Sequence, residues 1–166
     1  MEFQVGDKVV YPMHGAGVVE SIEEKEILGK KQEYYVLNFP MGGVKVMVPT
    51  QNVEQIGLRQ VISKDEIDKV MDILSGEETK MPANWSKRYR LNMNRIKSGD
   101  IYEIAAVVRN LTLRDKDRGL SNAERKMLNS ARQILISELA LSKGAAQEEI
   151  KAMVDKIGEK NTVNNA

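Results

Sequence analysis

A single tryptophan, Trp85, stands at the head of the most basic stretch of this chain. Between Thr79 and Gly99 there is no acidic residue but there are six basic ones, namely Lys80, Lys87, Arg88, Arg90, Arg95 and Lys97. A flat ring beside several cations is typical of a surface where the ring contacts nucleic acid bases and the cations hold phosphates. The same ring could instead anchor a hydrophobic core, and the residues alone leave both interpretations open.

A helical wheel that starts at Trp85 supports both interpretations. At about 100° per residue, Tyr89, Met93 and Ile96 fall on the same side as Trp85, which would make the ring part of a core stripe. In the first turn, however, the ring stands at the helix tip, where free N–H groups and the helix dipole favour phosphate. Asn84 is predicted to cap this helix because its side chain can accept a hydrogen bond from the first turn.

A second basic segment covers residues 109–132 and places Arg125 and Lys126 in the first turn of another predicted helix. The net charge of the whole chain is only +1, so the basic charge is concentrated in these two segments. Two basic helix starts in one half of the chain strengthen the nucleic-acid interpretation without excluding the core anchor.

Residues suited to catalysis are scarce. The only histidine, His14, lies in a Pro-Met-His-Gly turn without a partner that would make it a general base. The glycines Gly15 and Gly17 lead into a strand and lack the third glycine of a dinucleotide motif. Without cysteine there is no thiolate nucleophile or metal ligand, and this composition fits a reducing cytoplasm. We therefore expect no enzyme, no metal and no cofactor.

Hydrophobic periodicity divides the chain into two parts, which we call the β module (residues 1–60) and the helical module (residues 61–166). In the β module, β-branched and aromatic residues alternate with polar ones between breaks at residues 12–17, 28–30 and 40–43. This pattern predicts short antiparallel strands. Strands this short bury most when they curl into a small Tudor- or SH3-like barrel.

The helical module has apolar residues at helical spacing, which predicts a compact all-α unit and an α+β fold class overall. Capping boxes are expected at Ser63, Asp100 and Ser121, and helix ends near the glycines at positions 76, 99, 119, 144 and 158. Residues 146–166 are expected to form a peripheral helix that ends near 158 and a frayed tail. Neither module has a large core, so the two either pack together or stay hinged. No signal peptide or membrane span is predicted.

Four blocks of sequence carry a family resemblance that covers about residues 1–145. The blocks are Val5-Gly6-Asp7-x-Val9-Val10-Tyr11-Pro12-x-His14-Gly15, Val48-Pro49, Asn84-Trp85-Ser86-x-Arg88-Tyr89 and Arg118-Gly119-Leu120-Ser121. In this order and at this separation they resemble the CarD (CdnL) family of bacterial transcription regulators. The third and fourth blocks are specific in combination, although neither would be specific alone.

The resemblance implies a partner for each module. In that family the β module is a Tudor-like domain, shared with the transcription-repair coupling factor, that docks on the lobe of the RNA polymerase β subunit partly by strand addition. Polymerase contacts carry over to Lys25 and to the strand of Met47. The family can have Arg where this chain has Met47, so the polarity of that contact differs here.

For the helical module, the resemblance implies DNA binding at the upstream edge of the transcription bubble. The tryptophan that matches Trp85 wedges into the minor groove and hinders bubble collapse, while the residues that match Lys87, Arg88, Arg90 and Arg125 hold the DNA backbone. The protein would thus be a cytoplasmic, monomeric regulator that stabilises the open promoter complex. The alternative is an adaptor whose helical module binds another protein and never DNA.

Overall fold

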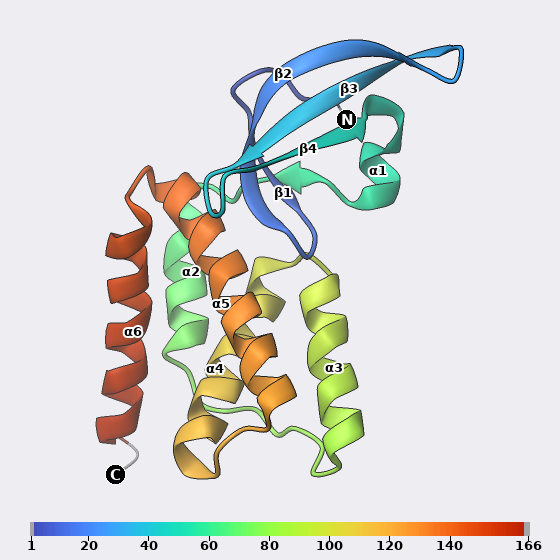
Figure 1. The fold of residues 1–166 in the computed structure, drawn as a ribbon. Coiled ribbons are helices and arrows are strands. Elements are labelled where there is room, and N and C mark those ends of the chain that lie inside the picture. Colours follow the sequence, from blue (N-terminus) through green and yellow to red (C-terminus); the bar gives the residue numbers. More distant parts are fainter. Residues whose placement is uncertain (1, 165–166) are drawn as a thin grey trace.

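The computed structural model describes the backbone of residues 2–164 and the side chains of residues 2–159. Strands come first and helices follow, as Figure 1 shows. The elements are β1 (Lys8–Tyr11), β2 (Gly15–Ile27), β3 (Lys30–Phe39), β4 (Val44–Pro49), η1 (Thr50–Asn52), α1 (Val53–Ile56), β5 (Arg59–Gln60), α2 (Lys64–Leu74), α3 (Trp85–Lys97), α4 (Ile101–Asp117), α5 (Asn122–Lys143) and α6 (Gln147–Asn164). The predicted α+β fold class is confirmed.

The strands form one antiparallel sheet in the order β4-β3-β2-β1-β5. Its core lies on one face of the sheet, where strand side chains meet α1 and the segments beside it, namely Phe3, Val9, Val19, Tyr35, Leu37, Phe39, Val48, Val53 and Leu58. The break predicted at residues 40–43 lies wholly between β3 and β4, whereas those predicted at 12–17 and 28–30 overlap the first residues of β2 and β3. The short helices between β4 and β5, and β5 itself, were not predicted because their sequence has no clear period.

The hairpin of β2 and β3 is longer than the short strands predicted. Leu28 and Gly29 both have positive φ (53° and 78°), as a tight two-residue hairpin turn requires, and pairing runs without interruption from the turn to Glu23 opposite Tyr34. Charged side chains on both faces allow the ladder to continue into solvent after the core has ended. The hairpin therefore projects as an arm from the sheet (Figure 1).

The predicted caps and ends of the helices are mostly confirmed. The side chains of Asn84, Asp100 and Ser121 accept hydrogen bonds from the first turns of α3, α4 and α5, whereas Ser63 makes no such bond to the backbone of α2. Three of the five glycines, at positions 99, 119 and 144, take the left-handed conformation at helix ends. Within the described residues, no helix is both long and apolar enough to cross a membrane.

The predicted end of the last helix at Gly158 is wrong. Helix α6 continues through Gly158 to Asn164, so most of the expected tail is helical, and residues 165–166 lie outside the described residues. Gly158 lies against α4, where Lys116 Nζ donates to its carbonyl oxygen at 2.6 Å. A contact between two helices therefore extends α6 past a residue whose local preference favours an end.

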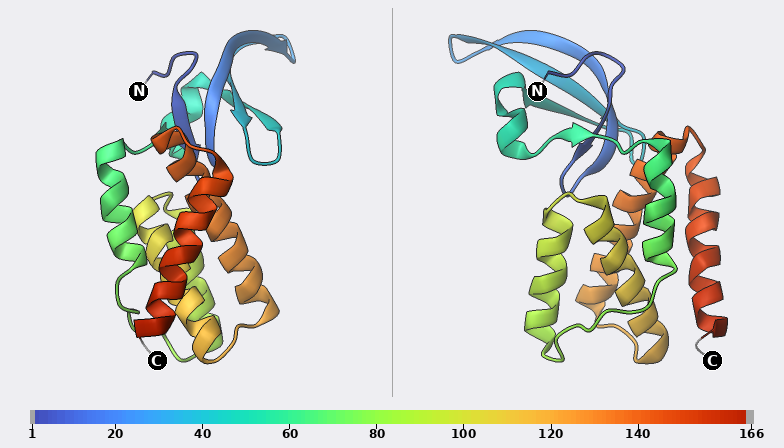
Figure 2. Two further views of the ribbon diagram at one scale, coloured as in Figure 1. Left: turned by 90° about the vertical axis from the view of Figure 1, so that its left-hand side faces the viewer. Right: turned by 180° about the vertical axis from the view of Figure 1, so that it is seen from behind.

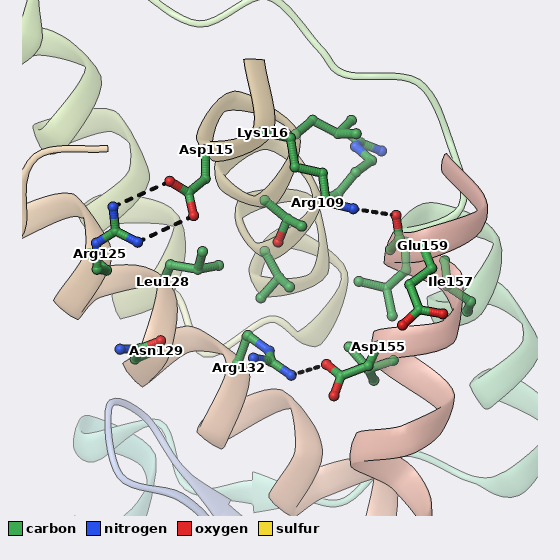
Figure 3. A pocket seen from close by; sticks show the side chains of 16 residues that line it. Arg109, Asp115, Lys116, Arg125, Leu128, Asn129, Arg132, Asp155, Ile157 and Glu159 are labelled. Atoms are coloured by element: carbon green, nitrogen blue, oxygen red, sulfur yellow. Dashed lines mark hydrogen bonds and ion pairs between the residues drawn. The ribbon is translucent and has the colours of Figure 1, made fainter. Parts of the chain in front are cut away.

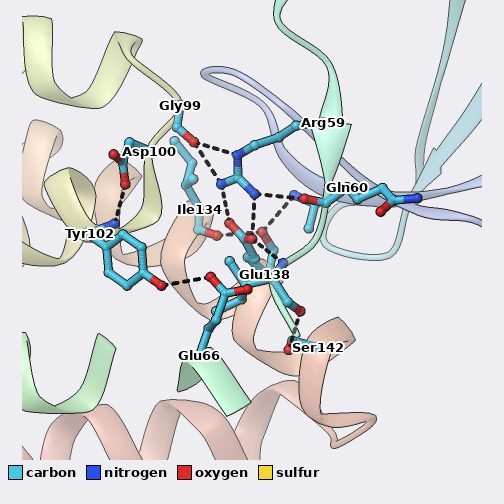
Figure 4. Close-up of polar contacts among 12 residues, drawn as sticks. Arg59, Gln60, Glu66, Gly99, Asp100, Tyr102, Ile134, Glu138 and Ser142 are labelled. Carbon is cyan, nitrogen blue, oxygen red and sulfur yellow. Dashed lines mark hydrogen bonds and ion pairs between the residues drawn. The ribbon is translucent and has the colours of Figure 1, made fainter. Parts of the chain in front are cut away.

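The two modules pack together, and α5 is the helix that joins them. The Arg59 guanidinium of β5 donates two bonds of 2.7 Å to the Glu138 carboxylate of α5 and also contacts the Gly99 carbonyl oxygen at 2.7 and 3.0 Å. Glu138 is 1% exposed and accepts a further bond from Ile62 N–H. Figure 4 shows this group, which we call the intermodule joint.

A second set of contacts extends the joint along α5. Ser137 Oγ accepts a bond of 2.9 Å from Ala16 N–H at the start of β2, and Lys8 Nζ donates to the Leu141 carbonyl oxygen at 2.9 Å. The approach is close at Gly15, because a Cβ placed there would lie 2.7 Å from Ser137 Oγ. The sheet is thus held against α5 by hydrogen bonds that a hinged arrangement would not make.

Replacing Gly15 with Ala tests this close approach, with Gly6→Ala as the matched control. Both glycines have strongly positive φ (97° and 93°), but only Gly15 has atoms near the added Cβ. The strained backbone costs about 1 kcal/mol in each variant, and the clash at Gly15 adds about 1–3 kcal/mol. Urea denaturation followed by circular dichroism measures both losses. Equal losses would contradict the tight joint.

Candidate nucleic-acid interface

Both basic helix starts lie at the same end of the helical module, opposite the sheet. Helices α3 and α5 begin there and α4 ends there, as both views in Figure 2 show. We call this end the basic pole and define it by Trp85, Lys87, Arg90, Arg125 and Lys126. The sequence could not show that residues 85–90 and 125–126 share one end, but the antiparallel order of the helices requires it.

At the basic pole, Trp85 combines features of both interpretations made from the sequence. Asn84 caps α3 by accepting a bond of 3.0 Å from Lys87 N–H, as predicted. The indole ring stacks on Tyr89 with ring centres 5.5 Å apart and an angle of 25° between the planes. Even so, the residue is 45% exposed. The ring is therefore rooted on the helical stripe while a large part of it faces solvent.

The structure places Arg88 inside the helical module, away from the phosphate-binding surface expected for it. Arg88 is 4% exposed, and its Nε donates to Glu124 Oε2 at 2.8 Å. Its Nη1 also contacts the carbonyl oxygens of Pro82 and Ala83 at 3.2 and 3.1 Å. The reason is helical spacing, because Arg88 lies one turn before the fully buried Asn92. Its donors thus connect the start of α3 to α5.

Glu124 is buried with Arg88, and its environment keeps it ionised. Burial alone would raise the pKa of this carboxyl, but hydrogen bonds from Arg88 and Ser121 and the positive charge of Arg88 outweigh that effect. The resulting pKa is lowered from its ordinary value. Glu124 was predicted only as part of a capping box, and its pairing with an arginine 36 residues away leaves no local signal in the sequence.

The remaining cations of the basic pole are exposed. Lys87, Arg90 and Lys126 all face solvent, and Arg125 makes two weak contacts of 3.4 Å with Asp115 while its side chain stays 53% exposed. Arg118, in the turn before α5, was not predicted as a site residue although it is 69% exposed at the same end. Its place between two basic helix starts is the signal that could have identified it.

A cavity of about 400 Å³ lies beside the pole between α4, α5 and α6 (Figure 3). Leu128 and other apolar side chains line it, and the ion pairs Arg125–Asp115 and Arg132–Asp155 lie at its edge. Two further cations that line it, Arg109 and Lys116, donate to the backbone carbonyl oxygens of Ile73 and Gly158. Among the described residues, no group of three or more His, Asp or Glu side chains could hold a metal ion.

In the β module, the structure places Lys25 and Met47 on the same face of the sheet. Met47 pairs with Val36 and Lys25 with Gln32, and these two partners are four residues apart on β3, so all four side chains point to one side. Tyr34 lies between them on that face. Strand β4, which carries Met47, has only β3 as a neighbour and is therefore an edge strand. We call this region the β4 face.

These features define a two-part protein with an open sheet edge in one module and a basic, tryptophan-bearing pole in the other. A family model described as CarD-like/TRCF RID domain matches residues 3–62, and one described as CarD, C-terminal domain matches residues 69–155. The chain therefore belongs to the CarD family, which confirms the resemblance seen in the sequence.

Individual relatives agree with the family models. The chain is 42% identical over 150 residues to "Putative transcription factor YdeB" of Bacillus subtilis (strain 168), which covers 90% of this chain and 98% of that protein. The solution structure of the 72-residue N-terminal domain of Myxococcus xanthus CarD is 39% identical, over 36% of this chain and 79% of that one, with a TM-score of 0.32. The structure of CdnLNt from Myxococcus xanthus is 40% identical, over 39% of this chain and 90% of that one, with a TM-score of 0.33.

Replacing Arg88 with Ala should destabilise the helical module strongly. The change leaves the buried Glu124 carboxylate without its cation, which costs about 3–5 kcal/mol in such pairs. Arg125→Ala is the control, because the exposed pair with Asp115 contributes at most about 1 kcal/mol. Urea denaturation at pH 7 measures the free energy of unfolding of both variants. Losses of similar size would show that the buried pair has no special role.

The lowered pKa of Glu124 predicts a loss of stability in acid. Unfolding returns this carboxyl to an ordinary pKa of about 4.3, so its contribution is present above that pH and is lost as the pH falls through the folded value. The variant Glu124→Gln should be less stable than the parent at pH 7, and the gap should narrow below about pH 4. Urea titrations between pH 7 and 3 measure the gap, and a constant gap would contradict the assignment.

Proposed function

We propose that this protein is a non-enzymatic transcription regulator that binds RNA polymerase through its β module and stabilises the open promoter complex through Trp85. The observation that carries the proposal is the exposed indole at the basic pole, flanked by cations and held at the opposite end of the molecule from an open sheet edge. Membership of the CarD family supports this assignment of a protein partner to one module and a DNA partner to the other.

Trp85 is the group we assign to the upstream edge of the transcription bubble. An aromatic wedge in the minor groove costs a few kcal/mol of unstacking, and this cost is smallest where the duplex is already partly melted. The ring is large and 45% exposed, and it is mounted on Tyr89, so it can contact bases without first leaving a core. Its insertion would hinder reannealing of the two strands and thus prolong the open complex.

We assign the phosphate contacts to Lys87, Arg90 and Arg125, which are exposed around the indole. Arg88 acts differently in this proposal, because its guanidinium is buried against Glu124 and supports the position of α3. Contacts from so few cations to the backbone are weak, salt-dependent and independent of sequence. Promoter preference would then follow from how readily each promoter melts rather than from base reading.

We assign polymerase binding to the β4 face, with the lobe of the β subunit as the partner. An edge strand has unpaired N–H and C=O groups that can extend a sheet into another protein. Met47 supplies an apolar contact beside that edge, and Lys25 supplies a charge further along the same face. Docking through this face tethers the basic pole to promoter DNA and raises its effective concentration, so weak DNA binding is sufficient.

Replacing Trp85 with Ala should shorten the lifetime of the open complex on a linear promoter fragment. Stacking of a base on an aromatic side chain contributes about 1–3 kcal/mol, which predicts a change of roughly five- to hundredfold. Heparin-challenge decay of complexes formed with purified polymerase measures the lifetime, and Trp85→Phe should retain part of the effect. The affinity for polymerase should not change. An unchanged lifetime would rule out the wedge, and crosslinking that never detects promoter DNA would favour the adaptor.

Replacing Met47 with Asp should weaken polymerase binding, because docking would bury a new charge without a partner. Met13→Asp is the matched control, since Met13 is similarly exposed (43% against 37%) but lies on the turn between β1 and β2. We expect at least a tenfold loss of affinity for Met47→Asp and little change for the control, measured by fluorescence anisotropy with labelled protein. Equal affinities would exclude the β4 face.

A further inference from the structure

We propose that Ser121 is a positioning residue that sets the orientation of the Trp85 ring before DNA binds. This inference rests on the proposed function, since it concerns how the wedge is presented. The indole Nε1 donates to Ser121 Oγ at 3.1 Å, and the two residues are 36 positions apart in the chain. Ser121 is also the residue that caps α5. One hydroxyl therefore connects the wedge of α3 to the start of α5.

The hydroxyl of Ser121 is held in this role by three hydrogen bonds. It accepts a bond of 3.1 Å from Glu124 N–H in addition to the one from Trp85, and it donates to Glu124 Oε1 at 3.2 Å. A hydroxyl has one donor and two acceptor sites, and all three are occupied here. The direction in which Ser121 accepts the indole N–H is therefore determined by the first turn of α5.

The same set of bonds returns to the backbone that precedes the tryptophan. Glu124 accepts from Arg88, and Arg88 donates to the carbonyl oxygens of Pro82 and Ala83. These residues form a closed circuit that runs from the ring through α5 and back to the approach of α3. The Trp85 ring and helix α3, which carries it, are therefore both hydrogen-bonded to the N-terminus of α5.

Two independent contacts define the plane of the ring. Tyr89 lies beneath it at an angle of 25°, and Ser121 holds its only polar atom. An exposed side chain without such contacts would occupy several rotamers and would lose that freedom on binding, which weakens binding. Here the Trp85 ring already loses this rotamer freedom when the protein folds. The ring therefore meets the transcription bubble in one orientation. The exposed part of the ring is the part left free by Tyr89 and Ser121.

The opposite possibility is that the bond to Ser121 must break before the ring can insert. The two possibilities differ in sign, because removing the hydroxyl would shorten the lifetime of the open complex in the first case and lengthen it in the second. Ser121→Ala also removes the cap of α5, which could act through helix stability alone. The control is therefore a variant that loses the cap of another helix. Asp100→Ala is suitable, since Asp100 caps α4 by accepting from Tyr102 N–H at 2.9 Å and has no contact with Trp85.

The experiment measures open-complex lifetime with full-length protein and purified polymerase for Ser121→Ala, Asp100→Ala and Ser121→Thr. One hydrogen bond of this kind predicts that Ser121→Ala shortens the lifetime by about three- to tenfold beyond any effect of Asp100→Ala. Ser121→Thr keeps a hydroxyl and should restore the parent lifetime. In a Trp85→Phe background, which has no indole N–H, Ser121→Ala should have no more effect than the loss of a cap.

Any result other than those expected overturns the positioning role of Ser121. The Trp85→Ala variant shows separately whether the proposed function itself fails. If Trp85→Ala shortens the lifetime but Ser121→Ala behaves like Asp100→Ala, the wedge stands and the positioning role fails. A longer lifetime for Ser121→Ala would show that the bond opposes insertion. A loss of equal size in the Trp85→Phe background would show that Ser121 acts only through the stability of α5. If Trp85→Ala itself has no effect, it is the proposed function that fails.

Discussion

The ion pair between the partly exposed Arg59 and the buried Glu138 is the interaction on which the rest of the molecule depends. Its guanidinium belongs to the last strand of the sheet, its carboxylate to the C-terminal part of α5, and its third partner, the Gly99 carbonyl oxygen, to the turn that ends α3. Removing Arg59 would leave the Glu138 carboxylate uncompensated in the interior, which costs about 3–5 kcal/mol for a buried charge. The sheet and the far ends of α3 and α5 are therefore held at one point.

The near ends of the same two helices are held by a second arginine–glutamate pair, in which both side chains are buried. Arg88 and Glu124 join the starts of α3 and α5, and in both pairs the arginine also donates to backbone carbonyl oxygens. Two helices that are clamped at both ends behave as one rigid support. Such rigidity suits a protein that must hold an aromatic ring at a distance from its docking surface, because flexibility between the two would reduce the effective concentration of the ring at the DNA.

The sequence predicted those features of the structure that depend on residues close together in the chain, and missed those that depend on distant pairs. The cap at Asn84, the start of α3 and the stripe through Tyr89 depend on residues a few positions apart, and all were read correctly. The burial of Arg88 depends on Glu124, 36 residues away, and the joint depends on a contact that spans 79 residues. No periodicity records such pairs, so an arginine in a basic stretch was read as a surface cation. The helix end predicted at Gly158 is wrong for the same reason. The packing of α6 on α4 outweighs the local preference of glycine for a helix end.

The length of α5 has a consequence for the geometry of a complex. Ser121 and Ser137 are 16 residues apart, so a rise of 1.5 Å per residue separates the tryptophan support from the sheet by roughly 24 Å. Each residue added to or removed from this interval would also turn one end about 100° against the other. The number of residues in α5 therefore sets both the distance between its two ends and the rotation of one end relative to the other. A change of three or four residues would move the Ser121 hydroxyl by about one turn relative to Trp85, which α3 carries, while nearly preserving the direction of the hydroxyl. A change of two would also turn this hydroxyl away from the indole N–H.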